Sequence, residues 1–299
     1  MATEPVTGVI EGLRRSVGER LFERVAGPEG PRRRDRIHGA DGERWFAEDS
    51  AIRQVHADAS MFIGGLRALL LQSLHPLAMA GVADHSGFKG DAWGRLQRTS
   101  HFLAVTTFGT AADAEKMVAA IRRVHETVVG VAPDGRPYAA SDPHLLRWVH
   151  VAEVDSFLRA HQTYGARPLD QAGRDAYVAE SGRVAQALGA LDVPGSEAEL
   201  AEQLRGYRPE LAGTPKARET ARFLLLNPPL PLLARPPYAA LSAAAVGLLP
   251  WWARRKLVLP YLPVTEATVV RAAGEVVTRG IRWALPAAPP SDPAATATP

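Results

Sequence analysis

The sequence predicts an all-α protein that folds as a single helical domain. Apolar residues recur at helical spacing through most long segments, and runs with the strict alternation of β-strands are nearly absent. No internal repeat or shift in composition marks a second domain. A chain of 299 residues, 46% of them hydrophobic and 22% charged, is also long enough to bury a sizeable core.

Helix boundaries follow from glycine and proline residues. The first helix stops at Gly27-Pro28, and a loop rich in proline, glycine and arginine then runs to Gly42. The second helix is long and apolar, with bends expected around Gly64-Gly65 and at Pro76. The expected helices cover residues 3–25, 50–82, 91–108, 110–130, 141–164, 170–190, 196–206, 214–226, 237–249 and 265–283.

Two of these helices carry clear start signals. Thr110 is expected to cap the fourth helix, with Asp113 and Glu115 in its first turn. Ser141-Asp142-Pro143 opens the fifth, with proline at an early position where its missing N–H is not needed. Between the two helices, Pro133-Asp134-Gly135 predicts a turn.

The absence of cysteine excludes several kinds of site. With Cys 0, the chain has no disulfide framework, no thiolate nucleophile and no cysteine-ligated zinc, iron–sulfur cluster or haem. A metal ion or haem iron would have to be held by histidine, carboxylate, tyrosine or methionine.

The charge does not point to nucleic acid. The net charge is +3, and the dense basic run Arg32-Arg33-Arg34 is followed at once by Asp35 and soon after by Asp41. Nucleic-acid binding requires basic residues clustered with aromatic residues along one surface. We therefore expect no nucleic-acid partner.

Targeting signals are also missing from the expected places. Residues 1–12 contain two glutamates and lack the apolar core of a signal peptide. Residues 237–253 form the longest uncharged stretch, but Pro250 interrupts it and it is too short for a membrane span. We therefore expect a cytoplasmic protein.

A weak peripheral membrane contact is an alternative reading of the same region. No acidic residue occurs between Glu219 and Glu266, and Trp251 and Trp252 lie beside the basic run 254–256. Tryptophan next to basic residues is typical of segments that lie at a lipid surface. The simpler reading is a buried helix.

His125 is the most informative of the nine histidines, all of which lie between His38 and His161. It shares an apolar helical stripe with Val118, Ile121, Val128 and Val129. A buried imidazole needs a partner, which could be a backbone carbonyl, a carboxylate or a metal. Two readings follow: a hydrogen-bonded core histidine, or a ligand of haem iron on an aliphatic helix face.

The helix over residues 91–108 carries a second polar pattern. Arg95, Thr99, Phe102 and Thr106 share one face, and Arg98 borders it. Guanidinium and hydroxyl groups on one face suit anion binding or the polarisation of a bound oxygen species. The alternative is a pair of surface or helix-capping arginines.

Several short motifs also occur in a specific order. They are 64–72, His75-Pro76, 81–86, 94–99, Phe108-Gly109, His125 with Gly130, Tyr138-Ala139, Asp142-Pro143 and, more weakly, 249–260. In this order they resemble the MpaB and latex-clearing-protein oxygenase family across residues 45–280. Each motif is weak alone, whereas the ordered set is specific.

The resemblance implies a globin-like helical core that holds one haem b. The family's iron-ligating histidine corresponds to His125, and its arginine and threonine near the haem correspond to Arg95 and Thr99. The chain then divides into an N-terminal helix and loop (1–44), the haem domain (45–283) and a disordered tail rich in proline and alanine (284–299).

Arg98 departs from the rubber-cleaving members of the family. Those members have a lysine at this position that can cap the iron, whereas arginine does not deprotonate. We therefore expect an open or water-bound distal side, with Arg98 as a third catalytic candidate. The same members use a pocket carboxylate as a base, and the acids nearest these motifs are Asp84 and Asp91.

Other residues are expected around the cofactor. Arg98, Arg122 and Arg123 could pair with the haem propionates, and His75 beside Pro76 is a candidate pocket residue. Apolar side chains of residues 61–74 are expected to line the substrate cavity.

Three functions from different classes remain open at this point. The leading prediction is a haem-b-dependent oxygenase that uses dioxygen on an apolar small molecule, by C=C cleavage or C–H oxidation. The second is a haem-binding sensor or carrier without turnover, since fold does not determine function. The third is a haem-free helical binding protein held at a membrane surface.

Overall fold

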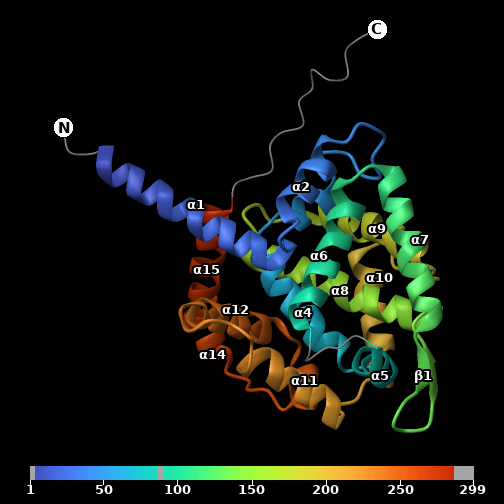
Figure 1. Ribbon diagram of the computed structural model, residues 1–299. Helices are drawn as coiled ribbons and strands as arrows, with labels where there is room; N and C mark the ends of the chain where they lie inside the picture. The colour runs from blue at the N-terminus through green and yellow to red at the C-terminus, as the bar shows by residue number, and fades with distance from the viewer. Residues whose placement is uncertain (1–3, 86–90, 286–299) are drawn as a thin grey trace.

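The computed structural model describes residues 4–85 and 91–285, which are predominantly helical, as the sequence predicts (Figure 1). The first helices are α1 (Glu4–Ala26), α2 (Gly30–Gly39), α3 (Ala51–His56), α4 (Met61–Gln72), α5 (Pro76–His85), α6 (Ala92–Phe108) and α7 (Ala111–Thr127). A hairpin of β1 (Val129–Val131) and β2 (Pro137–Ala139) follows. The remaining elements are α8 (Pro143–Tyr164), α9 (Gln171–Leu188), α10 (Glu197–Gly206), α11 (Pro215–Leu226), η1 (Leu232–Ala234), α12 (Arg235–Leu248), α13 (Trp251–Leu257), α14 (Pro263–Thr265), η2 (Glu266–Val270) and α15 (Arg271–Ala284).

The N-terminal region contains a helix where a loop is expected. α1 ends before Gly27-Pro28, as predicted, but α2 occupies most of the stretch that leads to Gly42. Proline in the first turn of α2 is compatible with a helix because its missing N–H would have no intrahelical partner there. Ile37 is buried and fixes this helix to the body of the protein.

The long apolar stretch 50–82 is divided into three helices, and the predicted bend around Gly64-Gly65 is wrong. α4 continues through both glycines, and a Cβ on Gly64 would lie 2.7 Å from Cδ1 of Phe157 on α8. This glycine therefore allows two helices to approach closely. The break at Pro76 is confirmed, because α5 starts there at 107° to α4.

The predicted turn at Pro133-Asp134-Gly135 is the tip of the β-hairpin. The preceding helix ends at Thr127, three residues before the expected Gly130, and β1 begins at Val129. A Cβ on Gly130 would lie 2.5 Å from the hydroxyl of Tyr138 on β2, so glycine is needed for this close pairing. The sequence did not indicate these two strands.

Helix α8 lies at the centre of the molecule and packs most extensively on α4 (Figure 1). Ile63, Leu70 and Leu71 of α4, and Leu74 just after it, are inaccessible to solvent. The expectation that residues 61–74 line a substrate cavity is therefore wrong for these four side chains. They belong to the buried core clusters that this segment forms with α8 and with α11–α13.

A buried ion pair fixes α4 to α8. Nη2 of Arg67 donates to Oδ2 of Asp155 at 2.7 Å, and Nη1 donates to Oγ of Ser156 at 2.6 Å. Nε donates to the carbonyl of Leu248 at 3.0 Å, at the end of α12. Arg67 therefore ties three helices together with nearly complete burial.

The two ends of the described chain lie on one side of the molecule. α1 packs on α6 and α15, and its first turns extend away from the body, whereas α7 and the hairpin lie on the opposite side (Figure 1). No single described helix is long and apolar enough to cross a membrane, although two bent pairs, α4 with α5 and η1–α12 with α13, pass that test together. The predicted disordered tail lies mostly outside the described residues.

Candidate functional site

Helix α6 presents one face to α1 and the opposite face to the interior. The carboxylate of Asp91 caps it by accepting from the N–H of Gly94 at 2.9 Å. On the outer face, Nε2 of Gln97 donates to the carbonyl of Arg24, and the Arg24 guanidinium lies over the ring of Trp93. The opposite face is the one that carries the predicted stripe of Arg95, Thr99, Phe102 and Thr106.

Arg95 and Thr99 differ in their environment along this stripe. Burial lowers the pKa of the Arg95 guanidinium, and the nearby positive charge of Arg98 lowers it further. Thr99, one turn later, keeps its side chain exposed although the same face turns away from α1. A partly buried guanidinium therefore lies next to accessible hydroxyl surface on the inner side of α6.

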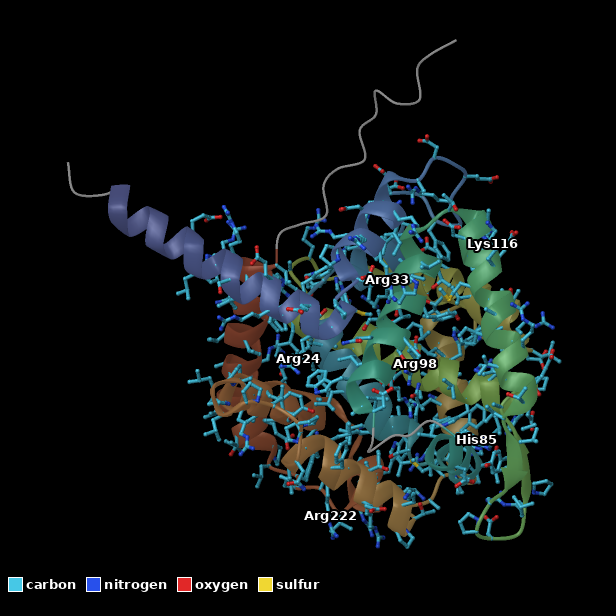
Figure 2. The ribbon with its side chains drawn as sticks, in the orientation of Figure 1. Arg24, Arg33, His85, Arg98, Lys116 and Arg222 are labelled. Atoms are coloured by element: carbon cyan, nitrogen blue, oxygen red, sulfur yellow. The ribbon has the colours of Figure 1, made fainter. Side chains whose placement is uncertain are left out.

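Arg98 lies on the outer border of this stripe (Figure 2). Its side chain is 64% exposed, and Nη1 pairs with Oδ2 of Asp91 at 2.9 Å. The hydrogen bond from Arg98 lowers the pKa of Asp91. Of the two acids considered as bases, Asp91 is therefore the helix cap and partner of Arg98, and Asp84 accepts a hydrogen bond from the hydroxyl of Tyr138 at 2.7 Å.

Helix α7 carries His125 on its inner stripe. Thr110 caps the helix as predicted, because its Oγ1 accepts from the N–H of Asp113 at 3.2 Å. Val118 and His125 share the stripe, but Val129 does not belong to it: Val129 lies in β1 and is 54% exposed. The change from helix to strand after Thr127 turns its side chain outward.

A ring nitrogen of His125 has no hydrogen-bond partner among the described residues. This nitrogen, Nδ1, is shielded from solvent, and burial lowers the pKa of the ring. Leaving a buried ring nitrogen unpaired is unfavourable. A neutral imidazole on a largely aliphatic helix face is the donor that an axial haem position requires, so this residue fits such a group. Arg122 and Arg123, on the same helix, are exposed.

Helix α8 contributes two polar side chains that the sequence analysis missed. His150 and Glu153 lie three residues apart on one face. Nε2 of His150 is buried and unpaired, and burial lowers the pKa of this ring to about 4. Burial raises the pKa of Glu153 from 4.5 to about 7, and its carboxylate makes no hydrogen bond with a described residue. Their spacing in a helix of otherwise apolar pattern was the available signal.

A hydrogen-bonded histidine links α3, α6 and α9. Nδ1 of His56 lies 2.8 Å from Oγ1 of Thr107, and its Nε2 lies 3.4 Å from the hydroxyl of Tyr177. Burial lowers the pKa of His56 to about 3, so the ring is neutral at physiological pH. Burial raises the pKa of Tyr177, and the charge of Glu153 on the neighbouring helix α8 raises it further.

Five helices connect these polar groups. α6 packs on α7, α7 on α9, α9 on α8, α8 on α3, and α3 on α6, which closes a ring. Each helix of the ring contributes at least one polar side chain. They are His56, Arg95, Thr99, His125, His150, Glu153 and Tyr177. We take the interior of this ring as the candidate functional site.

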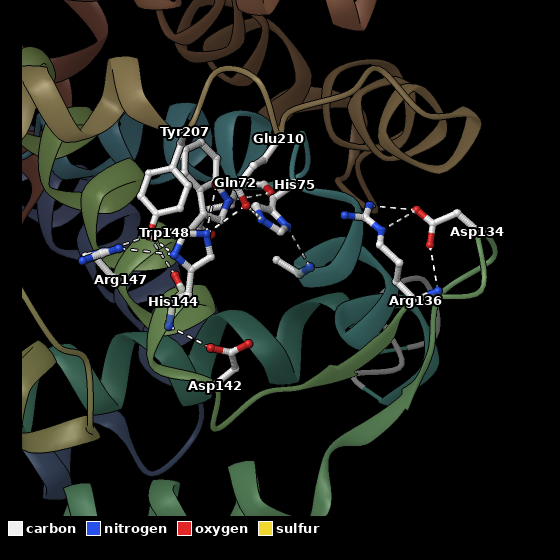
Figure 3. Close-up of polar contacts among 11 residues, drawn as sticks. Gln72, His75, Asp134, Arg136, Asp142, His144, Arg147, Trp148, Tyr207 and Glu210 are labelled. Carbon is white, nitrogen blue, oxygen red and sulfur yellow. Dashed lines mark hydrogen bonds and ion pairs between the residues drawn. The ribbon is translucent and has the colours of Figure 1, made fainter.

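His75 belongs to a different cluster, with His144 and Glu210 (Figure 3). Nε2 of His144 lies 2.8 Å from Oε2 of Glu210, and Nε2 of His75 lies 3.4 Å from the same oxygen. Among the described residues, these three are the group whose donor atoms lie close enough together to hold a metal ion. His75 makes its hydrogen bonds here and not with residues of α6 or α7.

The hydrogen bonds around this cluster are those expected when each histidine donates a proton to Glu210 and no metal ion is bound. Nδ1 of His75 accepts from the N–H of Ala78 at 3.5 Å, and Nδ1 of His144 accepts from Nη2 of Arg147 at 3.3 Å (Figure 3). Each ring therefore carries its proton on Nε2 and donates it to Glu210. Partial burial raises the pKa of Glu210, but the hydrogen bonds from His144 and His75 outweigh it and lower the pKa. A metal ion would have to displace both protons.

The raised pKa of Glu153 predicts a pH-dependent gain in stability when its charge is removed. Its pKa is higher in the folded chain than in the unfolded chain. The stability of the folded chain that depends on a neutral Glu153 carboxyl is therefore fully present below pH 4.5 and is lost as the pH rises to about 7. The free energy of unfolding of the Glu153→Gln variant should exceed that of the wild type by about 3 kcal/mol at pH 8. The two values should be equal near pH 4. Urea unfolding of both proteins across this range measures the difference.

Glu126→Gln serves as the control for that titration, because Glu126 is exposed on α7. It should show the same stability as the wild type at both pH values. A gain for Glu153→Gln that does not change between pH 4 and pH 8 would mean that the carboxyl group titrates normally in the folded protein.

Residues 53–283 match the family described as ER-bound oxygenase mpaB/B'/Rubber oxygenase, catalytic domain. No curated protein and no solved structure matches the chain. The match starts within α3 and ends within α15, so it includes His56 of α3 and the whole of α6, α7, α8 and α9. The chain therefore belongs to the mpaB and rubber oxygenase family and carries its catalytic domain.

Proposed function

We propose that this protein is a haem-b-dependent oxygenase that uses dioxygen on an apolar small molecule. The single observation that carries the proposal is His125: a neutral, unpaired imidazole on the inner stripe of α7 within the ring of five helices. Membership of an oxygenase family supports the reaction class. Because the chain has no cysteine, the axial ligand cannot be a thiolate.

The residues that would hold haem b come from α6 and α7. His125 would hold the iron through a ring nitrogen, and the exposed guanidinium groups of Arg122 and Arg123 are suitable partners for propionates. Arg98 does not coordinate iron because its guanidinium stays protonated, and it is paired with Asp91. When bound, haem b supplies the redox-active iron that dioxygen chemistry requires.

The polar side chains of the ring would orient the reactants and move protons. Arg95 can donate hydrogen bonds to a developing negative charge, and the hydroxyl of Thr99 is accessible beside it. Glu153, with a pKa of about 7, can hold or release a proton at its carboxylate near neutral pH. We assign the proton-transfer role to Glu153 because of its raised pKa. Asp84 and Asp91, the acids near the family motifs, are bonded to Tyr138 and Arg98 instead.

The substrate is proposed to be apolar because the inner faces of α6 and α7 are apolar apart from these groups. Phe102 and Leu103 on α6 and Ile121 and Val128 near His125 are only partly buried, so part of their surface is available for contact. Ligand sites typically combine such apolar lining with a few convergent polar groups.

Oxygen-isotope labelling separates the proposed function from the sensor or carrier alternative. The protein is supplied with haem, reduced, and mixed with ¹⁸O₂ and squalene as an apolar alkene probe. We expect ¹⁸O in an oxidised squalene product, with loss of that product in the haem-free protein. A stable oxygenated haem spectrum without labelled product would indicate a carrier and contradict the oxygenase.

A further inference from the structure

The segment between α13 and α14 exposes a cluster of apolar side chains. Val258, Tyr261, Leu262 and Val264 are each more than half exposed, and residues 257–265 contain no charge. Single apolar residues on a surface are common and need no explanation. Four within seven consecutive residues form a continuous apolar projection, which we call the apolar loop (258–264).

The apolar loop is held in place at both ends. Buried Arg254 donates from Nη1 to Oε1 of Glu266 at 2.6 Å, and its guanidinium lies over the ring of Tyr261. The same Glu266 oxygen accepts from the N–H of Leu262 at 2.9 Å. Val258 adopts a left-handed conformation, φ 57°, which is unusual for a β-branched residue. The fold thus maintains an exposed apolar projection.

Three arginines contact α13, the helix that leads into the apolar loop. Arg255 lies over the ring of Trp251, Arg208 lies over the ring of Trp252, and Nε of Arg218 donates to the carbonyl of Lys256 at 3.1 Å. We call Arg208, Arg218 and Arg255 the basic collar, and all three are exposed. Arg255 lies in the acid-free stretch between Glu219 and Glu266, whereas Arg208 and Arg218 have Glu210 and Glu219 close by in the sequence.

We propose that the apolar loop inserts into the surface of an anionic lipid bilayer, with the basic collar at the level of the headgroups. Exposed aliphatic side chains flanked by tryptophan, tyrosine and arginine match the polarity gradient of that interface. Positive charge next to the loop complements anionic lipids. A second copy of the chain fits less well, because a symmetric contact would bring two basic collars together.

This surface is separate from the proposed oxygenase site. α12, α14 and α15 lie on one side of the molecule, and α7 with the hairpin lies on the other (Figure 1). The proposal therefore does not depend on haem or on turnover, and its test can be read on the full chain in either state.

Co-sedimentation with vesicles tests the proposal. The full chain is mixed with vesicles of phosphatidylcholine, with and without phosphatidylglycerol, at low and high salt. We expect binding to the anionic vesicles that weakens with salt. The double variant Tyr261→Asn/Leu262→Asn should bind them at least about tenfold more weakly, because each removes an apolar group from the inserted surface.

Leu233→Asn is the matched control. Leu233 is 93% exposed but precedes α12, whereas the apolar loop is anchored at the other end of that helix, about 20 Å away along 14 residues. This variant should bind like the wild type. Absence of vesicle binding, or an equal loss for Leu233→Asn and the double variant, would overturn the proposal. Self-association that the double variant abolishes, without vesicle binding, would also overturn it in favour of a dimer.

Discussion

Replacing His125 with alanine is expected to remove haem from the protein, so that the Soret band falls from stoichiometric to near zero after unbound haem is washed away. Haem iron needs an axial donor, and His125 is the one ring on the inner stripe of α7. The helix itself should survive, because alanine has the highest helix propensity and removes an unpaired polar group. Circular dichroism of the variant checks that the fold is retained.

Two further histidine variants make this result specific. His101→Ala is the control, because His101 lies next to Arg33 and Arg36 of α2 and should not affect haem binding. His150→Ala tests the rival donor on α8, whose Nε2 is also buried and unpaired. Free imidazole should restore a ligated spectrum to His125→Ala, since it can occupy the space of the missing ring. If His125→Ala keeps its spectrum and His150→Ala loses it, the axial ligand lies on α8.

Replacing Arg67 with methionine is expected to lower the free energy of unfolding by about 3–5 kcal/mol, because it leaves the buried carboxylate of Asp155 without its cationic partner. Arg67 is 2% exposed and also donates to Ser156 and to the carbonyl of Leu248. Each of those acceptors would lose a hydrogen bond inside the core. Urea unfolding of both proteins at pH 7 gives the difference.

Arg159 provides a matched control on the same carboxylate. Its Nε lies 3.4 Å from Oδ1 of Asp155, but its side chain is 56% exposed. Exposed ion pairs contribute at most about 1 kcal/mol, so Arg159→Met should have a small effect. Equal losses for the two variants would show that burial does not determine the strength of this interaction.

The sequence predicted the elements whose ends are marked by local chemistry. The cap at Thr110, the start at Asp142-Pro143 and the break at Pro76 depend on residues within one turn of each other, and all three are found. Elements that depend on distant contacts were missed. Gly64 was interpreted as a bend because its reason, the close approach of Phe157 on α8, lies far away in the sequence.

In the candidate site, too, residues marked by local sequence signals were predicted and residues that depend on distant contacts were not. His125 could be found because the apolar stripe around it is readable within α7, and Arg95 because its neighbours on α6 repeat at helical spacing. His56, His150 and Glu153 were missed because their significance comes from burial by other helices, which shifts their pKa values. His75 was grouped with the cofactor residues, but the fold places it with His144 and Glu210.

A single set of absorption spectra tests the central claim most directly. The full chain is supplied with haem, freed of unbound haem, and measured in the ferric, ferrous and ferrous–CO forms. A histidine-ligated haem with an open distal position predicts a Soret band in all three forms and a shift of that band when CO binds. Absence of a Soret band in the washed protein would contradict haem binding, and a ferrous band that CO does not shift would contradict the open distal position.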